Sequence, residues 1–339
     1  MKGRRKPRLR QKEETLMSEN DYKGAYSTII EYKKKLLSKK NIVKKVESEG
    51  RVLVVQGSMD NVHLSLRYCY ASEKDFVQPT QLKSRDLNNY DLIVIGCPGT
   101  GTVEHGNDDR LREYVADGGF LLTTDWCLKN IIEPVFPGYI RYNGYPTKDE
   151  IVPVRISNHE HPITADLIEK GLANWWIETS SMPIQIINPD VTTLIDSPQL
   201  GKKYGEPAVV VASSYGDGTI VHMISHTHLQ KTKGEDVYLS AFLISNTLDE
   251  AVKSKMALTQ EVFPQAPELT SITSIITKAI QVKNVGNSIC TICGSSCHDS
   301  SDSIYQCTSC GSHYHKNCLE TWLAEQGVCF TCRKALLIE

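Results

Sequence analysis

The sequence predicts an α/β protein: a domain with a mostly parallel sheet, followed by a small cysteine-rich module. Apolar runs typical of buried strands alternate with helical segments between residues 50 and 257. Such alternation with short connections gives a parallel sheet with right-handed crossovers. The second prediction comes from the cysteines, because eight of the eleven lie from Cys290 onward. A dense local cluster in a chain without secretory features indicates metal ligands rather than disulfides.

Residues 1–49 are predicted to be a basic arm, partly disordered and partly helical. Residues 1–48 hold 15 Lys/Arg against 6 Asp/Glu, a balance of +9 in a chain whose net charge is −2. Three interpretations stay open: a solvated tail, contact with nucleic acid through counterion release, or docking to an acidic protein partner. The chain has no run of 18 apolar residues, so no membrane contact is expected. Its first residues do not have the pattern of a secretory signal, and we expect a cytoplasmic protein.

The elements of the domain at 50–257 follow from apolar pattern and turn residues. The predicted strands are continuous apolar runs that stop at glycine, proline or a polar residue: "RVLVVQG", "YDLIVIGCPGTG", "FLLTTD", and the two strands of "PAVVVASSYGDGTIVHMISH" joined at Gly216–Gly218. The predicted helices lie between or after them: "SMDNVHLSLRYC", "DDRLREYVADGG" and "EDVYLSAFLISNTLDEAVKSKM". Residues 258–287 are predicted to be a linker with a short helix, and the cysteine-rich module spans 288–335.

Four ligand pairs with metal-binding spacing lie within the module. They are Cys290 with Cys293, Cys307 with Cys310, His315 with Cys318, and Cys329 with Cys332. Two residues between paired ligands let both side chains face one ion, and eight ligands suffice for two tetrahedral Zn²⁺ sites. The spacing leaves open whether the pairs combine sequentially or crosswise.

The stretch "YHKNCLETWLAEQGVCFTCR" resembles the second half of a RING finger, and "CTIC" resembles its first knuckle. This resemblance implies crosswise pairing: Cys290, Cys293, His315 and Cys318 for one zinc, and Cys307, Cys310, Cys329 and Cys332 for the other. The sequence departs from the usual pattern at Ser312, where a RING finger of this kind has histidine, and His313 is a possible substitute ligand. The order of ligands also fits a PHD-like finger, although Gly327 stands where that family has an aromatic residue. Cys297 and His298 are predicted to be spare residues.

A RING finger implies a ubiquitin-protein ligase that docks a ubiquitin-charged conjugating enzyme and acts on a protein substrate. The docking positions implied by the resemblance are Ile292, Trp322, Phe330 and Arg333. Phe330 replaces the usual proline, and Arg333 matches the cation that contacts both ubiquitin and the conjugating enzyme. The alternative is a non-enzymatic zinc-finger scaffold, either PHD-like or associated with nucleic acid.

The domain at 50–257 resembles the flavodoxin-like class I glutamine amidotransferase superfold, in particular its ThuA-like branch. The resemblance rests on "YDLIVIGCPG", "LREYVADGGFLLTTD", "HPIT" and "GDGTIVHMISH". In that superfold a cysteine on a turn after a strand is activated by a histidine. Here the turn falls near Asp125, which leaves Cys127 with His226 or His228 as a possible hydrolase pair. Cys97 and the segment "HEHP" (159–162) are further candidates for a nucleophile and a metal site, but a small buried residue and a turn ahead of Pro162 are the favoured interpretations.

Overall fold

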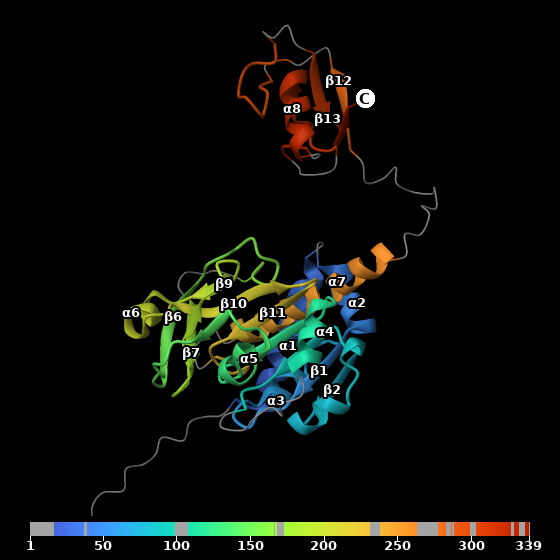
Figure 1. Ribbon diagram of the computed structural model, residues 1–339. Helices are drawn as coiled ribbons and strands as arrows, with labels where there is room; N and C mark the ends of the chain where they lie inside the picture. Colours follow the sequence, from blue (N-terminus) through green and yellow to red (C-terminus); the bar gives the residue numbers. More distant parts are fainter. Residues whose placement is uncertain are drawn as a thin grey trace, which may run out of the picture. The chain divides into compact units, whose positions relative to one another are not determined.

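The computed structural model describes residues 17–36, 39–98, 108–165, 167, 173–230, 238–262, 277–282, 286, 288–298, 303–326, 329–331 and 336–338. The chain divides into two compact units, Met1–Phe263 and Pro264–Glu339, which are described separately (Figure 1). We call them the α/β unit and the zinc module.

A nine-stranded sheet in the order β2-β1-β3-β4-β11-β10-β9-β6-β7 forms the centre of the α/β unit. Its first five strands pair in parallel, and the other four extend it with antiparallel pairs. The predicted fold class is confirmed. The strands are β2 (Glu73–Val77), β1 (Arg51–Val55), β3 (Leu92–Ile95), β4 (Phe120–Thr124), β11 (Gly218–Met223), β10 (Ala208–Tyr215), β9 (Thr192–Asp196), β6 (Glu150–Ile156) and β7 (Ala173–Ile177). β5 (Ile140–Tyr142) and β8 (Ile184–Ile186) form a separate antiparallel pair.

Helices pack around this sheet (Figure 1). The α-helices are α1 (Glu19–Lys35), α2 (Lys40–Glu49), α3 (Val62–Arg67), α4 (Asp108–Ala116), α5 (Glu133–Val135), α6 (Pro198–Tyr204) and α7 (Leu239–Val262). Shorter turns of 3₁₀ or π type are η1 (Pro79–Ser84), η2 (Leu87–Asn89) and η3 (Leu128–Ile132). In the described part of the chain, no helix is both long and apolar enough to cross a membrane.

The N-terminal helices, which lie within the basic and partly helical arm predicted for residues 1–49, belong to the core of the α/β unit. α1 starts with a capping box in which Ser18 and Asp21 bond to each other's backbone N–H groups. Tyr26 and Ile29 on α1 and Val46 on α2 are fully buried against the rest of this core. Burying these apolar side chains is what holds the two basic helices on the domain. Residues 1–16 lie outside the described residues.

The zinc module contains a four-stranded sheet, in the order β14-β13-β12-β15, and one helix. Its elements are β12 (Thr277–Val282), β13 (Ile304–Cys307), β14 (His313–His315), α8 (Lys316–Gln326) and β15 (Leu336–Ile338). Residues 277–282, expected within a linker that carries a short helix, instead form β12 and pair with β13. The strand therefore extends the module beyond the predicted start at residue 288.

Candidate metal centre

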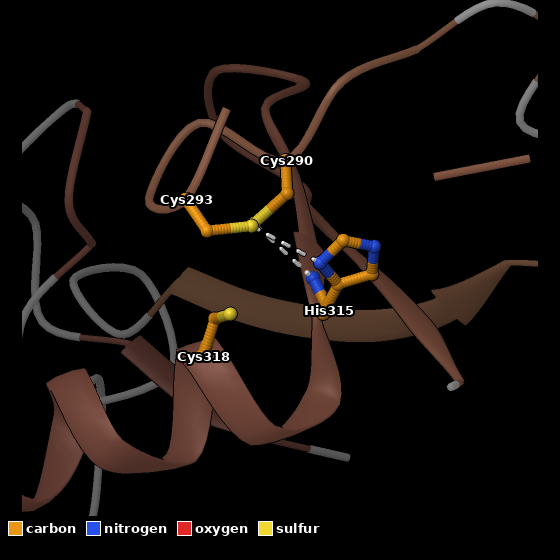
Figure 2. A group of neighbouring side chains, drawn as sticks. All are labelled: Cys290, Cys293, His315 and Cys318. Atoms are coloured by element: carbon orange, nitrogen blue, oxygen red, sulfur yellow. Dashed lines mark hydrogen bonds between the residues drawn. The ribbon is translucent and has the colours of Figure 1, made fainter. Parts of the chain in front are cut away.

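One predicted ligand set converges in the zinc module. The ligand atoms of Cys290, Cys293, His315 and Cys318 all lie within 4.8 Å of one another. Figure 2 shows the two cysteines of the first knuckle facing His315, with Cys318 approaching from α8. The Cys293 sulfur is 3.4 Å from Nδ1 of His315. Three thiolates and one imidazole at this spacing form a donor set suited to tetrahedral Zn²⁺.

The second donor group collects sulfur atoms from three further predicted ligands. Cys307, Cys310 and Cys329 lie within the same 4.8 Å limit, and the sulfurs of Cys310 and Cys329 are 3.7 Å apart. Cys332, the fourth predicted ligand, lies outside the described residues. In this arrangement the first ligand pair lies with the third, and the second pair lies with Cys329 of the last pair, which is the grouping of a cross-braced module.

Both knuckles have the same local fold because each continues Cys-x-x-Cys with glycine. Gly294 and Gly311 have φ angles of +75° and +74°, a region that favours glycine. Each glycine N–H donates to the carbonyl of the first cysteine of its pair, at 2.8 Å in both cases. The repeated Cys-x-x-Cys-Gly pattern is visible in the sequence. It is the signal from which the shared turn of the two knuckles could have been predicted.

Surrounding groups orient the ligands of the first donor set. Nε2 of His315 is 3.3 Å from the Ser296 carbonyl, so an Nε2–H there leaves the Nδ1 lone pair facing the sulfurs. The backbone N–H of Ser295 lowers the pKa of Cys293 to about 6. Burial, followed by the neighbouring Cys293, raises the pKa of Cys318 to about 12. Clustered thiolates repel one another, so ionising all three requires a cation among them.

Residues expected to be spare or substitute ligands take other roles. Cys297 is buried in the module core, and its N–H donates to Ser288. His313 lies on β14, and its carbonyl accepts a bond from the Thr291 N–H. Within the described residues neither Cys297 nor His313 joins a donor group. Ser312, at the position where histidine was expected, accepts a bond from the Cys310 thiol at 3.4 Å.

The described docking residues, Ile292, Trp322 and Phe330, are partly exposed in the zinc module. Ile292 and Phe330 are half-buried and pack against that core. The Trp322 ring meets the Phe330 ring edge-to-face, with centroids 4.8 Å apart. Trp322 and Phe330 therefore form one aromatic contact between α8 and the last knuckle. Arg333 lies outside the described residues.

Cys127 and His226, the possible hydrolase residues of the α/β unit, have different partners in the structure. The buried Cys127 thiol donates to the carbonyls of Ile95 and Gly96, and burial raises its pKa well above the ordinary value. His226 instead lies with Cys97 and Asp125, whose ligand atoms are within 4.8 Å of its own. Asp125 occupies the turn after β4 with a φ of +44°.

The segment "HEHP" forms a turn. The Asn158 side chain accepts bonds from the N–H groups of Glu160 and His161, both at 3.1 Å. The Ile163 N–H donates to Nδ1 of His161 at 3.2 Å. The turn interpretation accounts for these contacts.

Comparison with known protein families supports the predicted RING-finger resemblance of the zinc module. Residues 288–333 match the Ring finger domain family model, which confirms the resemblance for this part of the chain. The match and the Cys/His groups together imply that the module binds zinc. No relative was found among the curated proteins.

The N-terminal part of the chain is similar to several solved structures at low identity. A thua-like protein from Bacteroides uniformis is 14% identical, over 60% of this chain and 91% of that one, with a TM-score of 0.41. PurLQS from Thermotoga maritima is 15% identical, over 61% and 99%, with a TM-score of 0.42. A beta-galactosidase from Bacillus circulans is 18% identical, over 60% and 31%, with a TM-score of 0.40. The match to the Ring finger domain covers residues 288–333, which lie within the zinc module.

Proposed function

We propose that this chain is a RING-type ubiquitin-protein ligase. Its zinc module, holding two Zn²⁺ ions, docks a ubiquitin-charged conjugating enzyme, and its α/β unit recruits the protein substrate or anchors an assembly. The Ring finger match at 288–333 and the crosswise grouping of the ligands support this function. The donor set Cys307, Cys310 and Cys329 would be completed by Cys332.

The observation that carries the proposal is apolar surface beside the ligands. Ile292 lies between the two cysteines of the first knuckle, and Trp322 contacts Phe330 next to the last one. None of the three is needed to hold zinc. Aromatic and aliphatic side chains supported by a rigid core are the usual anchors of a protein interface.

Such a ligase acts by positioning, without a covalent intermediate on its own residues. The zinc-braced loops would hold the conjugating enzyme, and Arg333 would bond both that enzyme and ubiquitin. Restricting a flexible thioester to its reactive pose accelerates transfer because the entropy of alignment is lost on binding rather than in the reaction.

Autoubiquitination with a panel of conjugating enzymes tests the proposal. Ile292→Ala and Arg333→Ala are each expected to reduce transfer at least roughly tenfold, the loss of about 1.4 kcal/mol of interaction. Ile280→Ala is the matched control, because Ile280 is a 38% exposed isoleucine on β12 of the same module. Transfer by this control should equal that of the unmodified chain.

Two outcomes would overturn the proposal. The first is an absence of transfer with every conjugating enzyme, which would favour the non-enzymatic scaffold. The second is transfer that neither substitution weakens. A zinc measurement accompanies the assay, since fewer than two ions per chain would contradict the two-zinc module. Cys127→Ala should leave transfer unchanged, because the Cys127 thiol is buried in the other unit.

A further inference from the structure

A second group of metal-ligating side chains lies in the α/β unit, where three strands end. Asp125 follows β4, Glu178 follows β7, and His226 and His228 follow β11. The ligand atoms of Glu178, His226 and His228 lie within 4.8 Å of one another. Hydrogen bonds hold the end of β7 there: the Trp175 indole donates to Ser225 at 2.7 Å, and the Trp176 N–H donates to Gln230 at 2.7 Å.

Each histidine of this group presents one nitrogen to Glu178 and the other toward an oxygen, although within the described residues Nε2 of His226 makes no hydrogen bond. Nδ1 of His226 is 3.1 Å from Oε1 of Glu178, while its Nε2 is 3.4 Å from Oδ2 of Asp125. Nε2 of His228 faces the same Glu178 oxygen, and its Nδ1 is 3.2 Å from the Leu229 carbonyl. Metal-bound histidines characteristically direct their second nitrogen to a carboxylate or a backbone carbonyl.

The positions of the rings are held by further contacts. The Trp176 ring stacks on His228, with centroids 4.0 Å apart and planes 27° from parallel. The Met182 N–H donates to Asp125 at 3.0 Å, and the Asp125 N–H donates to Met223 at 2.8 Å. The donors are therefore arranged in advance by side chains and backbone around them, as a binding site requires.

The two carboxylate oxygens of Glu178 differ in their hydrogen bonding. Its Oε1 faces the His226 N–H and a ring nitrogen of each histidine. Its Oε2 is buried, and within the described residues it has no hydrogen-bond partner. A buried carboxylate oxygen without a partner is costly, and a cation bound by both oxygens of Glu178 would satisfy it.

The charge of the group points the same way. Among the described residues, the ion pairs of Asp125 and Glu178 involve histidine only. Two carboxylates close to the same imidazole favour a positive charge between them, and a metal ion supplies that charge without protonating the ligands.

We propose that Glu178, His226 and His228 bind one divalent transition-metal ion, with Asp125 orienting His226. Two imidazoles and one carboxylate suit Zn²⁺ and leave further coordination positions for water or substrate. Bonds of about 2.1 Å to a tetrahedral ion place its ligand atoms roughly 3.4 Å apart, close to the 3.1 Å between His226 and Glu178. The side chains of Glu178, His226 and His228 are 13%, 13% and 15% exposed, so solvent reaches them.

The zinc content of the full chain, measured by mass spectrometry after dialysis against buffered Zn²⁺, tests the site. Glu178→Gln and His228→Gln are each expected to contain one ion fewer than the unmodified chain. The comparison is a difference between variants, so it does not depend on how many ions the zinc module holds. His63→Gln is the matched control, since His63 lies on α3 outside the group. Equal zinc in all four proteins would overturn the proposal.

A titration with Co²⁺ decides the question even if a variant fails to fold. Co²⁺ added to the unmodified chain with its thiolate sites filled by Zn²⁺ should give visible absorption bands without a near-ultraviolet sulfur band. Asp125→Asn keeps a residue that tolerates positive φ and should weaken this binding about 10- to 100-fold, the effect of losing an orienting partner. Absence of the visible bands, or bands accompanied only by sulfur charge transfer, would overturn the site.

Discussion

Each of the two units of this chain is stabilised in a different way. The α/β unit has one continuous apolar core that includes the strands β1, β3 and β4 and the helices α1, α2 and α7. Among the described residues, the core of the zinc module is far smaller, and four of its ten buried members are cysteines. A small apolar core rarely stabilises a fold by itself, whereas a structural metal can. Stability therefore rests on burial in one unit and on metal ligation in the other.

Removal of zinc should have the largest effect on stability, and it should affect the two units differently. A chelator at neutral pH is expected to unfold the zinc module, since structural zinc contributes about 10–16 kcal/mol in small zinc-binding folds. The α/β unit should keep its cooperative thermal transition because its core does not depend on the module's ligands. Calorimetry combined with NMR of the module's methyl groups measures both events.

A pair of cysteine variants controls for effects of the chelator. Cys293→Ser removes a ligand and should reproduce the loss of the module without any chelator. Cys297→Ala changes a buried cysteine outside the donor groups and should leave the zinc content unchanged. A module that stays folded after Cys293→Ser would show that its apolar core suffices.

The α/β unit contains a buried ion pair, and removing one partner should have the next largest effect on the free energy of unfolding. Lys33 and Asp249 form an ion pair at 2.6 Å with side chains only 1% and 0% exposed, and Lys33 also donates to Tyr70 at 3.0 Å. Lys33→Met leaves the Asp249 carboxylate buried without its cation, which should cost about 3–5 kcal/mol of unfolding free energy. Urea denaturation of the α/β transition measures it.

The neighbouring lysine provides the control for Lys33. Lys34 pairs with Glu47 at 2.6 Å, but these side chains are 44% and 36% exposed. Lys34→Met should change the unfolding free energy by less than about 1 kcal/mol, because exposed ion pairs contribute little. Equal costs for the two substitutions would contradict a structural role for the buried pair.

Lys33 also shows where sequence analysis stops. It is one of fifteen basic residues in the first 48, which were predicted to form a basic arm that is solvated, contacts nucleic acid or docks an acidic partner. Its partner Asp249 lies 216 residues further along the chain, and only the packing of α1 against α7 brings the two together. Composition gives the number of charges, but burial decides which of them are solvated.

The strands also differ in how well their own residues predict them. Apolar runs predicted β1, β3, β4, β10 and β11, whose residues are buried almost throughout. β2 was missed because its residues "EKDFV" are largely exposed at the edge of the sheet. β6 contains Pro153 and alternates only in part, so its pattern is weak.

The two candidate sites differ in predictability for a related reason. The ligands of the zinc module come in pairs separated by two residues, and spacing alone identifies them. Glu178 is 48 residues from His226 in sequence and follows the last strand of the sheet order. Its role depends on how the antiparallel half of the sheet returns to β11, which no local pattern contains.

Acid should destabilise the α/β unit through a buried histidine. His222 on β11 is fully buried, with Nδ1 2.8 Å from the Thr123 hydroxyl, and burial lowers its pKa to about 3. The unfolded chain, with the ordinary histidine pKa of about 6.5, binds a proton that the folded chain excludes. Stability present above pH 6.5 should therefore fall by about 1.4 kcal/mol per pH unit as the pH drops from 6.5 toward 3.

A variant separates His222 from the other titrating groups. His222→Asn removes the ring, so its unfolding free energy should depend less steeply on pH over the same range. Urea denaturation at several pH values, following the α/β transition, gives both slopes. Identical slopes for the two proteins would mean that His222 is protonated in the folded chain.

The smallest effect is expected from two glycines with the same backbone strain in different units. Gly294 (φ +75°) and Gly138 (φ +88°) both have open space where a Cβ would be added, so alanine is disfavoured there by backbone conformation alone. That conformation costs an L-residue about 1–2 kcal/mol. In the zinc module, Gly294→Ala should appear as roughly tenfold weaker zinc binding, because metal ligation and folding are coupled there. In the α/β unit, Gly138→Ala should lower the unfolding free energy by a similar amount while zinc affinity, measured by competition with a chelating dye, stays unchanged. If Gly294→Ala destabilised the module without weakening its zinc binding, folding and zinc ligation would be separable there. The zinc module, like the α/β unit, would then be stabilised independently of metal.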